Sequence, residues 1–202
     1  MWPWEHLAFG YLLYSGYARF VSPGRVRNDA AIAAAFGTQF PDLVDKSLAW
    51  GFDVLPGGLS LAHSLVFGVP LCLFVVLLAR RYGTSSVGPA FTVGYLSHLL
   101  GDILYPIATG GFEFDSFPSF LLWPLIPRTF SDSRGLAGNV TYYFEQFTVF
   151  LGTPRGQLYL VIELFLLSLA LFVWALDGFP GTRWVRHRLQ PRRSTPDSDG
   201  PR

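Results

Sequence analysis

Two long stretches of this chain carry almost no charge, and they limit what it can fold into. Residues 59–79 contain no Asp, Glu, Lys or Arg, and residues 156–176 are interrupted only by Glu163. A helix of roughly 20 residues is enough to cross about 30 Å of hydrocarbon. With 50% hydrophobic and 14% charged residues, the chain is also more apolar than an ordinary soluble domain. The sequence therefore predicts an all-α protein that is built into a membrane.

Three further segments complete a predicted bundle of five transmembrane helices. Residues 87–107 form a third long apolar stretch, whereas residues 4–20 and 29–40 are shorter and richer in small residues. Pro41 is expected to end the helix of residues 29–40, because proline lacks the amide hydrogen that a helix interior needs. Residues 108–155 form the largest connection, and we expect it to lie at the membrane interface or to fold back over a site. Residues 1–180 then make one membrane domain, and residues 181–202 make a basic, disordered tail.

The basic residues orient this bundle, because cytoplasmic loops are enriched in Lys and Arg. In the five-helix topology most of the 15 basic residues fall on one side. That side holds Arg19, Arg25, Arg27, Arg80, Arg81, Arg183, Arg186, Arg188, Arg192, Arg193 and Arg202. The opposite side holds Lys46, Arg128, Arg134 and Arg155. The asymmetry predicts an N-terminus outside and a cytoplasmic C-terminus.

His98 and Asp102 are the polar pair that the apolar surroundings make informative. They lie four residues apart, so both side chains share one face of a helix. Ionisable groups cost several kcal/mol if they face lipid, and the pair should therefore face the interior of the protein. There it makes either a structural hydrogen bond to a neighbouring helix or a metal site. The predicted topology brings further candidate ligands to the same outer side, namely His6, Asp42, Asp45 and His63.

The available side chains restrict the chemistry of such a site. Cys72 is the only cysteine, so any metal must be held by nitrogen and oxygen atoms. Imidazole and carboxylate ligands suit Zn²⁺ best, with Mn²⁺ or Fe²⁺ as alternatives. A divalent ion would lower the pKa of a bound water to roughly 7 and polarise a carbonyl or phosphoryl oxygen, which predicts a hydrolase. The near-neutral balance of 15 basic and 14 acidic residues gives no sign of a nucleic-acid partner.

Four short motifs, in this order, carry a resemblance to a known family. They are Phe-Pro-Asp-Leu-Val-Asp at residues 40–45, Ala-His-Ser-Leu at 62–65, Gly-Tyr-Leu-Ser-His-Leu-Leu-Gly-Asp at 94–102 and Leu-Trp-Pro at 122–124. Together with His6, they resemble the successive signatures of the membrane-bound metal-dependent hydrolases. These are small bacterial and archaeal inner-membrane proteins related to a LexA-regulated membrane protein. The resemblance extends over roughly residues 4–126 and implies a metal-dependent hydrolase.

Two positions depart from the family pattern. Lys46 stands where a histidine usually follows the second aspartate, and Gly-Gly-Leu-Ser-Leu at residues 57–61 replaces a segment of the His-Arg-Gly type. Two expected ligands are thus absent, and Lys46 is expected either to neutralise a carboxylate or to contact an anionic substrate. For Glu163 a helix-packing hydrogen bond and a role in the site are both open.

The prediction for the site is as follows. His63, His98 and Asp102 are metal ligands, His6 and Asp42 complete the site, and Asp45 is a further ligand or the catalytic proton acceptor. The expected partners are membrane lipid and a phosphoester-like or lipid-like small molecule that reaches the site at the outer face. The alternative is a non-catalytic membrane protein that binds or transports a metal ion or protons, because transporters also place acidic and histidine residues in their helices.

Overall fold

The computed structural model of the chain describes residues 1–21, 26–110, 119–127, 130 and 134–182. Across these residues the secondary structure is helical, without a strand. The helices are α1 (Pro3–Phe20), α2 (Asn28–Lys46), α3 (Leu65–Arg81), α4 (Val87–Thr109), α5 (Gly135–Leu151) and α6 (Pro154–Leu176). A π-helical turn (Ser47–Gly51) continues α2, and a 3-10 turn (Ser119–Leu122) precedes α5. The all-α prediction is confirmed, while residues 183–202 of the predicted tail lie outside the described part of the chain.

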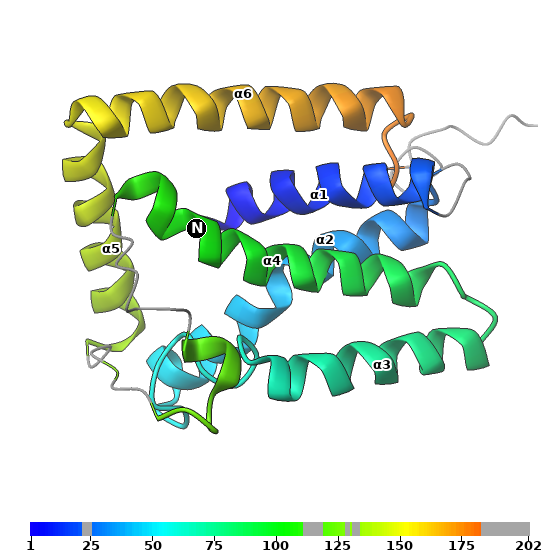
Figure 1. The fold of residues 1–202 in the computed structure, drawn as a ribbon, viewed down its shortest axis with the longest axis horizontal. Coiled ribbons are helices and arrows are strands. Elements are labelled where there is room, and N and C mark those ends of the chain that lie inside the picture. Colours follow the sequence, from blue (N-terminus) through cyan, green and yellow to red (C-terminus); the bar gives the residue numbers. More distant parts are fainter. Residues whose placement is uncertain (22–25, 111–118, 128–129, 131–133, 183–202) are drawn as a thin grey trace, which may run out of the picture.

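The long helices run alternately in opposite directions through the bundle (Figure 1). α6 forms one side and α3 the other, with α1 and α4 between them and α2 packed against α4. α5 lies crosswise at the end of the bundle where α1, α3 and α6 begin. At that end, the first turn of α1, the last turn of α2 and the loop before α3 meet the second half of α4, and this is where the predicted ligands gather.

The prediction that Pro41 ends the second helix is wrong. Pro41 lies inside α2, which continues to Lys46. Proline removes the hydrogen bond to the carbonyl of residue 37, but tertiary packing holds this part of the helix. An ideal Cβ on Gly37 would lie 2.4 Å from the Phe91 carbonyl oxygen, and Pro41 itself is buried. The close contact with α4 thus overrides the local preference, and it keeps Asp42 and Asp45 on a helix.

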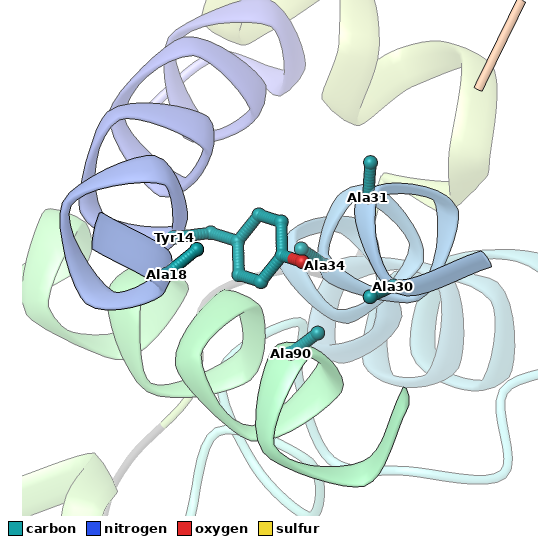
Figure 2. Packing of buried hydrophobic residues seen from close by; sticks show 6 residues of the cluster. All are labelled: Tyr14, Ala18, Ala30, Ala31, Ala34 and Ala90. Atoms are coloured by element: carbon teal, nitrogen blue, oxygen red, sulfur yellow. The ribbon is translucent and has the colours of Figure 1, made fainter. Parts of the chain in front are cut away.

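Small side chains allow α1, α2 and α4 to approach one another. An ideal Cβ on Gly94 would lie 2.1 Å from the Ala34 carbonyl oxygen, which shows that the two backbones touch. Figure 2 shows the adjoining cluster, in which the ring of Tyr14 lies among alanines of three helices. Its members are Tyr14, Ala18, Ala30, Ala31, Ala34 and Ala90. Small residues at helix crossings are typical of membrane bundles, in which close van der Waals contact drives association.

Two other boundaries differ from the prediction. α3 begins at Leu65, and Ser64 caps it by accepting a hydrogen bond from the Val66 amide at 3.1 Å, so His63 lies in the preceding loop. The large outer connection contains the 17-residue helix α5, which apolar and aromatic composition alone did not reveal. Both differences have the same cause, since an apolar run does not by itself say where a helix begins.

The expectation of five transmembrane spans is not confirmed. Among the described helices, only α6 is long and apolar enough to cross a membrane by length and composition. α3 has 17 residues and ends in Arg80 and Arg81. Only 17% of the most apolar window of α6 is buried. Its apolar surface therefore faces outward and does not form the core of the protein.

A carboxylate at the far end of the bundle joins α1 to α6. Asp177, which caps α6, accepts hydrogen bonds from Arg19, Tyr11 and Ser15, each at 2.7 Å. Burial raises the pKa of the Asp177 carboxyl, but these three donors outweigh burial and hold the pKa below its ordinary value. The contact fixes one end of α1, while the other end carries His6.

Candidate metal centre

Four side-chain atoms converge on one point between α2, α4 and the loop before α3. His63 Nε2 and His98 Nε2 are 3.1 Å apart, and each is 3.4 Å from Asp102 Oδ2. Asp42 Oδ1 lies 3.4 Å from His63 Nε2 and 3.7 Å from His98 Nε2. Ligand atoms bound at 2.0–2.1 Å around a tetrahedral ion are about 3.3 Å from one another. We call these four atoms the cage, and their spacing is that of a metal-ligand set.

The hydrogen bonding of the cage leaves an acceptor unsatisfied. Asp42 Oδ1 is buried and has no hydrogen-bond partner among the described residues. A buried acceptor without a partner costs about 1–3 kcal/mol, and more when it is charged. Two neutral imidazoles and two carboxylates also leave an excess of negative charge in a buried place. A divalent cation would satisfy both the acceptor and the charge, so the residues present fit a metal ion.

A second layer of groups fixes the orientation of both imidazoles. His63 Nδ1 is 2.8 Å from Asp45 Oδ2, and His98 Nδ1 is 2.6 Å from the carbonyl oxygen of Thr38. Each Nδ1–H donates to its oxygen, which leaves the lone pair of Nε2 free to bind an ion. Carboxylate or carbonyl partners of this kind are typical of metal-binding histidines.

Asp45 lies behind His63 rather than in the cage. Its carboxylate is fully buried and accepts the amides of Ser60 and Ala62, each at 2.8 Å, and of His63 at 3.2 Å. These bonds tie the loop of residues 57–64 to the last turn of α2. The geometry is that of an orienting residue, while the role of ligand or proton acceptor stays a prediction.

His6 lies beside the cage. Its ring stacks on His98 with centroids 3.7 Å apart, and its Nε2 is 3.2 Å from Asp102 Oδ1. That oxygen is the one that Asp102 does not direct at the cage, and it also accepts the Met1 amine at 2.8 Å. Both ring nitrogens of His6 are buried and have no hydrogen-bond partner among the described residues. His6 is thus available as a further ligand or as a proton acceptor next to the cage.

Lys46 neutralises a carboxylate, which is one of its two expected roles. Its Nζ lies 2.5 Å from Asp42 Oδ2 and 5.5 Å from the centre of the Trp50 ring. The salt bridge occupies one oxygen of Asp42 and turns the other oxygen toward the cage. The residue that departs from the family pattern therefore helps to position a candidate ligand.

Part of the large outer connection covers the site, as expected. Ser64 donates a hydrogen bond to the carbonyl oxygen of Trp123, and the ring of Phe120 packs edge-on against His63 with centroids 6.3 Å apart. Tyr95 donates to the carbonyl oxygen of Ala62 from below. The segment around residues 119–123 thereby shields the imidazole of His63 from solvent.

The structure also settles which kind of contact Glu163 makes, and it reveals partners that sequence reasoning missed. Glu163 accepts a hydrogen bond from Trp4 Nε1 at 2.6 Å, which is a packing contact between α6 and α1. The missed partners are the Thr38 carbonyl and the amides of Ser60 and Ala62. Backbone groups leave no mark in a residue pattern, so only the fold could reveal them.

Comparison with known proteins gives one match. No curated protein and no solved structure matches the chain. A family model does, and its description agrees with the predicted inner-membrane family, although it does not name a reaction. The metal-dependent hydrolase assignment therefore stays a prediction. The match covers residues 1–179, and the chain belongs to the YdjM inner membrane protein family.

Proposed function

We propose that the cage binds one divalent metal ion through Asp42, His63, His98 and Asp102. The observation that carries this proposal is the convergence of two imidazole nitrogens and two carboxylate oxygens within 3.1–3.7 Å of one another. Zn²⁺ is the first choice, because it takes nitrogen and oxygen ligands in a tetrahedral arrangement. Mn²⁺ and Fe²⁺ accept the same donors.

We propose further that the bound ion serves a hydrolase, with a phosphoester-like or lipid-like substrate. The ion would supply Lewis acidity and a water of lowered pKa. His63 and His98 hold their Nε2 atoms in place through Asp45 and Thr38, and Lys46 balances the charge of Asp42. His6 supports a reaction rather than a purely structural site, because an imidazole without hydrogen-bond partners stands next to the cage and can accept a proton.

One observation favours the alternative function. Four protein ligands fill a tetrahedral zinc site, and filled sites are usually structural, whereas catalytic zinc keeps one position for water. A non-catalytic site that binds or transports a metal ion or protons is therefore the second candidate. A hydrolase requires a five-coordinate zinc or a six-coordinate Mn²⁺ or Fe²⁺, which would leave room for water.

For the membrane topology we propose that α1, α2, α3, α4 and α6 span the inner membrane and that the site faces outward. Large apolar side chains are exposed on both outer helices of the bundle, such as Phe74 and Leu77 on α3 and Phe165 and Phe172 on α6. Exposed apolar faces of this size need lipid or a partner. The crosswise helix α5 would then lie along the outer surface, and Arg19, Arg80 and Arg81 would lie at the cytoplasmic end.

Element analysis of the protein purified in detergent tests the metal site. We expect about one divalent ion per chain, lost in His98→Ala and in Asp102→Ala. His187→Ala, in the tail outside the described residues, is the matched control and should keep the ion. Protein that folds but holds no metal overturns the proposal.

Activity then separates the two functions. We expect metal-dependent hydrolysis of a member of a panel of phosphoesters and acyl esters, with His63→Ala as background. Turnover no higher than this background, together with metal or proton flux into liposomes, would favour the alternative instead.

A further inference from the structure

A cavity of about 520 Å³ lies between α1, α4 and α6. Pockets for small molecules usually measure about 300–1,000 Å³. Most of its wall is apolar, with Phe9 from α1, Leu104 from α4 and Leu166 from α6. Leu158 and Ile162 line it and are also exposed on the outer surface of the bundle. In a protein of an inner-membrane family, the cavity therefore opens toward hydrocarbon.

The cavity adjoins the candidate metal centre. Met1 and Gly101 form part of its wall. An ideal Cβ on Gly101 would lie 3.2 Å from His6 Nδ1, so only a glycine backbone separates the cavity from the ring of His6. The other ring nitrogen of His6 faces Asp102 at 3.2 Å. A molecule in the cavity would thus lie one imidazole away from the cage.

The polar part of the wall includes an unsatisfied acceptor. Glu163 is 8% exposed, and while its Oε1 accepts from Trp4, its Oε2 has no hydrogen-bond partner among the described residues. Glu5 lies in the same wall, with its oxygens occupied by Tyr159 and by the Trp2 amide. A carboxylate oxygen left unpaired in an apolar cavity calls for an O–H or N–H donor.

From these contacts we propose that the cavity holds a single-chain amphiphile, whose hydrocarbon chain lies between α1, α4 and α6. Its head carries a hydroxyl or ammonium group that donates to Glu163. The inference rests on the proposed hydrolase function only in naming this amphiphile as the substrate class. The binding itself depends on the apolar wall and on Glu163, and not on the metal.

Photolabelling tests the binding. The full chain in nanodiscs is incubated with a lysophospholipid, a long-chain alcohol and a long-chain amine, each with a diazirine in its alkyl chain, and labelled residues are mapped by peptide mass spectrometry. We expect saturable labelling of Leu104 and Leu166, and non-saturable labelling of the exposed Leu171 by surrounding lipid. The three probes separate a hydroxyl from an ammonium as the donor.

Two variants fill the cavity and one does not. Ala8→Trp and Leu167→Trp each place an indole in the space, and we expect at least a fivefold loss of saturable labelling. Leu164→Trp is the matched control, because Leu164 lies on the exposed face of α6 outside the cavity lining, and its labelling should be unchanged. Glu163→Gln should weaken the probe with the preferred head group and leave the labelling of Leu171 as it was.

The outcomes separate this inference from the proposed function. Saturable labelling that persists in metal-free His98→Ala supports the cavity whatever the metal does. Labelling of Leu104 and Leu166 that never saturates, or that survives both folded tryptophan variants with their metal intact, overturns the inference without touching the metal proposal. Saturable labelling of a chain that never binds metal would overturn the proposed function and leave the cavity as a lipid site.

Discussion

His63 and His98 point their Nε2 atoms at each other across 3.1 Å, although they lie 35 positions apart in the chain. Each ring is held from behind by an oxygen, from Asp45 in one case and from Thr38 in the other. Two imidazoles fixed in this way cannot both turn aside to find other partners. The pair therefore behaves as a preformed half of a binding site, and the predictions below test how it is built.

The orienting role of Asp45 predicts a graded loss of metal affinity. Asp45→Asn keeps the shape of the side chain but weakens the bond to His63 Nδ1, and we expect the affinity to fall about 10- to 100-fold. Isothermal titration with Zn²⁺ measures it. A ligand role predicts a different result, namely loss of the ion even at saturation, as expected for His98→Ala.

The salt bridge of Lys46 predicts a change in the opposite direction. Lys46→Met removes the positive charge beside Asp42 and leaves the carboxylate free to interact with the ion. We expect metal affinity to rise about fivefold, in line with roughly 1 kcal/mol for a partly exposed ion pair. Arg134→Met, at a cation on the same end of the protein, is the control. Weaker metal binding in Lys46→Met would mean that the salt bridge positions Asp42 more than it competes with the ion.

The contact between α2 and α4 predicts an asymmetric response to added methyl groups. A Cβ at Gly94 would meet the Ala34 carbonyl oxygen at 2.1 Å and the Thr38 amide at 3.1 Å. Gly94→Ala should lower the free energy of unfolding by about 2–3 kcal/mol and also weaken metal binding, because it displaces the residue that orients His98. In Gly16→Ala the Cβ meets nothing within 4 Å, so this control should be neutral or gain up to about 1 kcal/mol. Equal losses in both variants, measured by SDS titration, contradict the contact.

The Asp177 cluster predicts a pH dependence of stability. Its pKa is lower in the folded protein than in the unfolded chain, so the cluster stabilises the fold above the unfolded-state pKa of about 4. This stabilisation is lost as the pH falls through the folded-state pKa. Asp177→Asn should cost about 1–2 kcal/mol at pH 7, a figure that allows for the exposed Arg19 side chain, and the difference from wild type should shrink toward pH 3.

Asp29 serves as the control for that measurement. It pairs with Arg27 at 2.9 Å, but both side chains are exposed, so Asp29→Asn should change stability by less than about 0.5 kcal/mol. A difference between wild type and Asp177→Asn that stays constant from pH 7 to pH 3 would contradict the role of the charged carboxylate.

Much of the fold could be read from hydrophobic patterning, and its errors have identifiable causes. The predicted segments 4–20, 87–107 and 156–176 agree closely with α1, α4 and α6. Pro41 misled the prediction for α2, because the packing of Gly37 and Gly94 that carries the helix through proline involves residues far apart in sequence. α5 was missed because its aromatic and polar residues resemble an interfacial loop.

The sequence by itself determined which side chains were available to a site. Five spaced histidines and aspartates in an apolar chain with one cysteine can offer a metal only nitrogen and oxygen, and the i, i+4 spacing of His98 and Asp102 puts two of them on one helix face. Only the tertiary structure decided that Asp42, His63, His98 and Asp102 form the cage, while Asp45 stands behind it and His6 beside it. The reason is physical: side-chain convergence depends on helix crossings and on backbone donors and acceptors, and these are set by packing between distant segments, not by local residue preference.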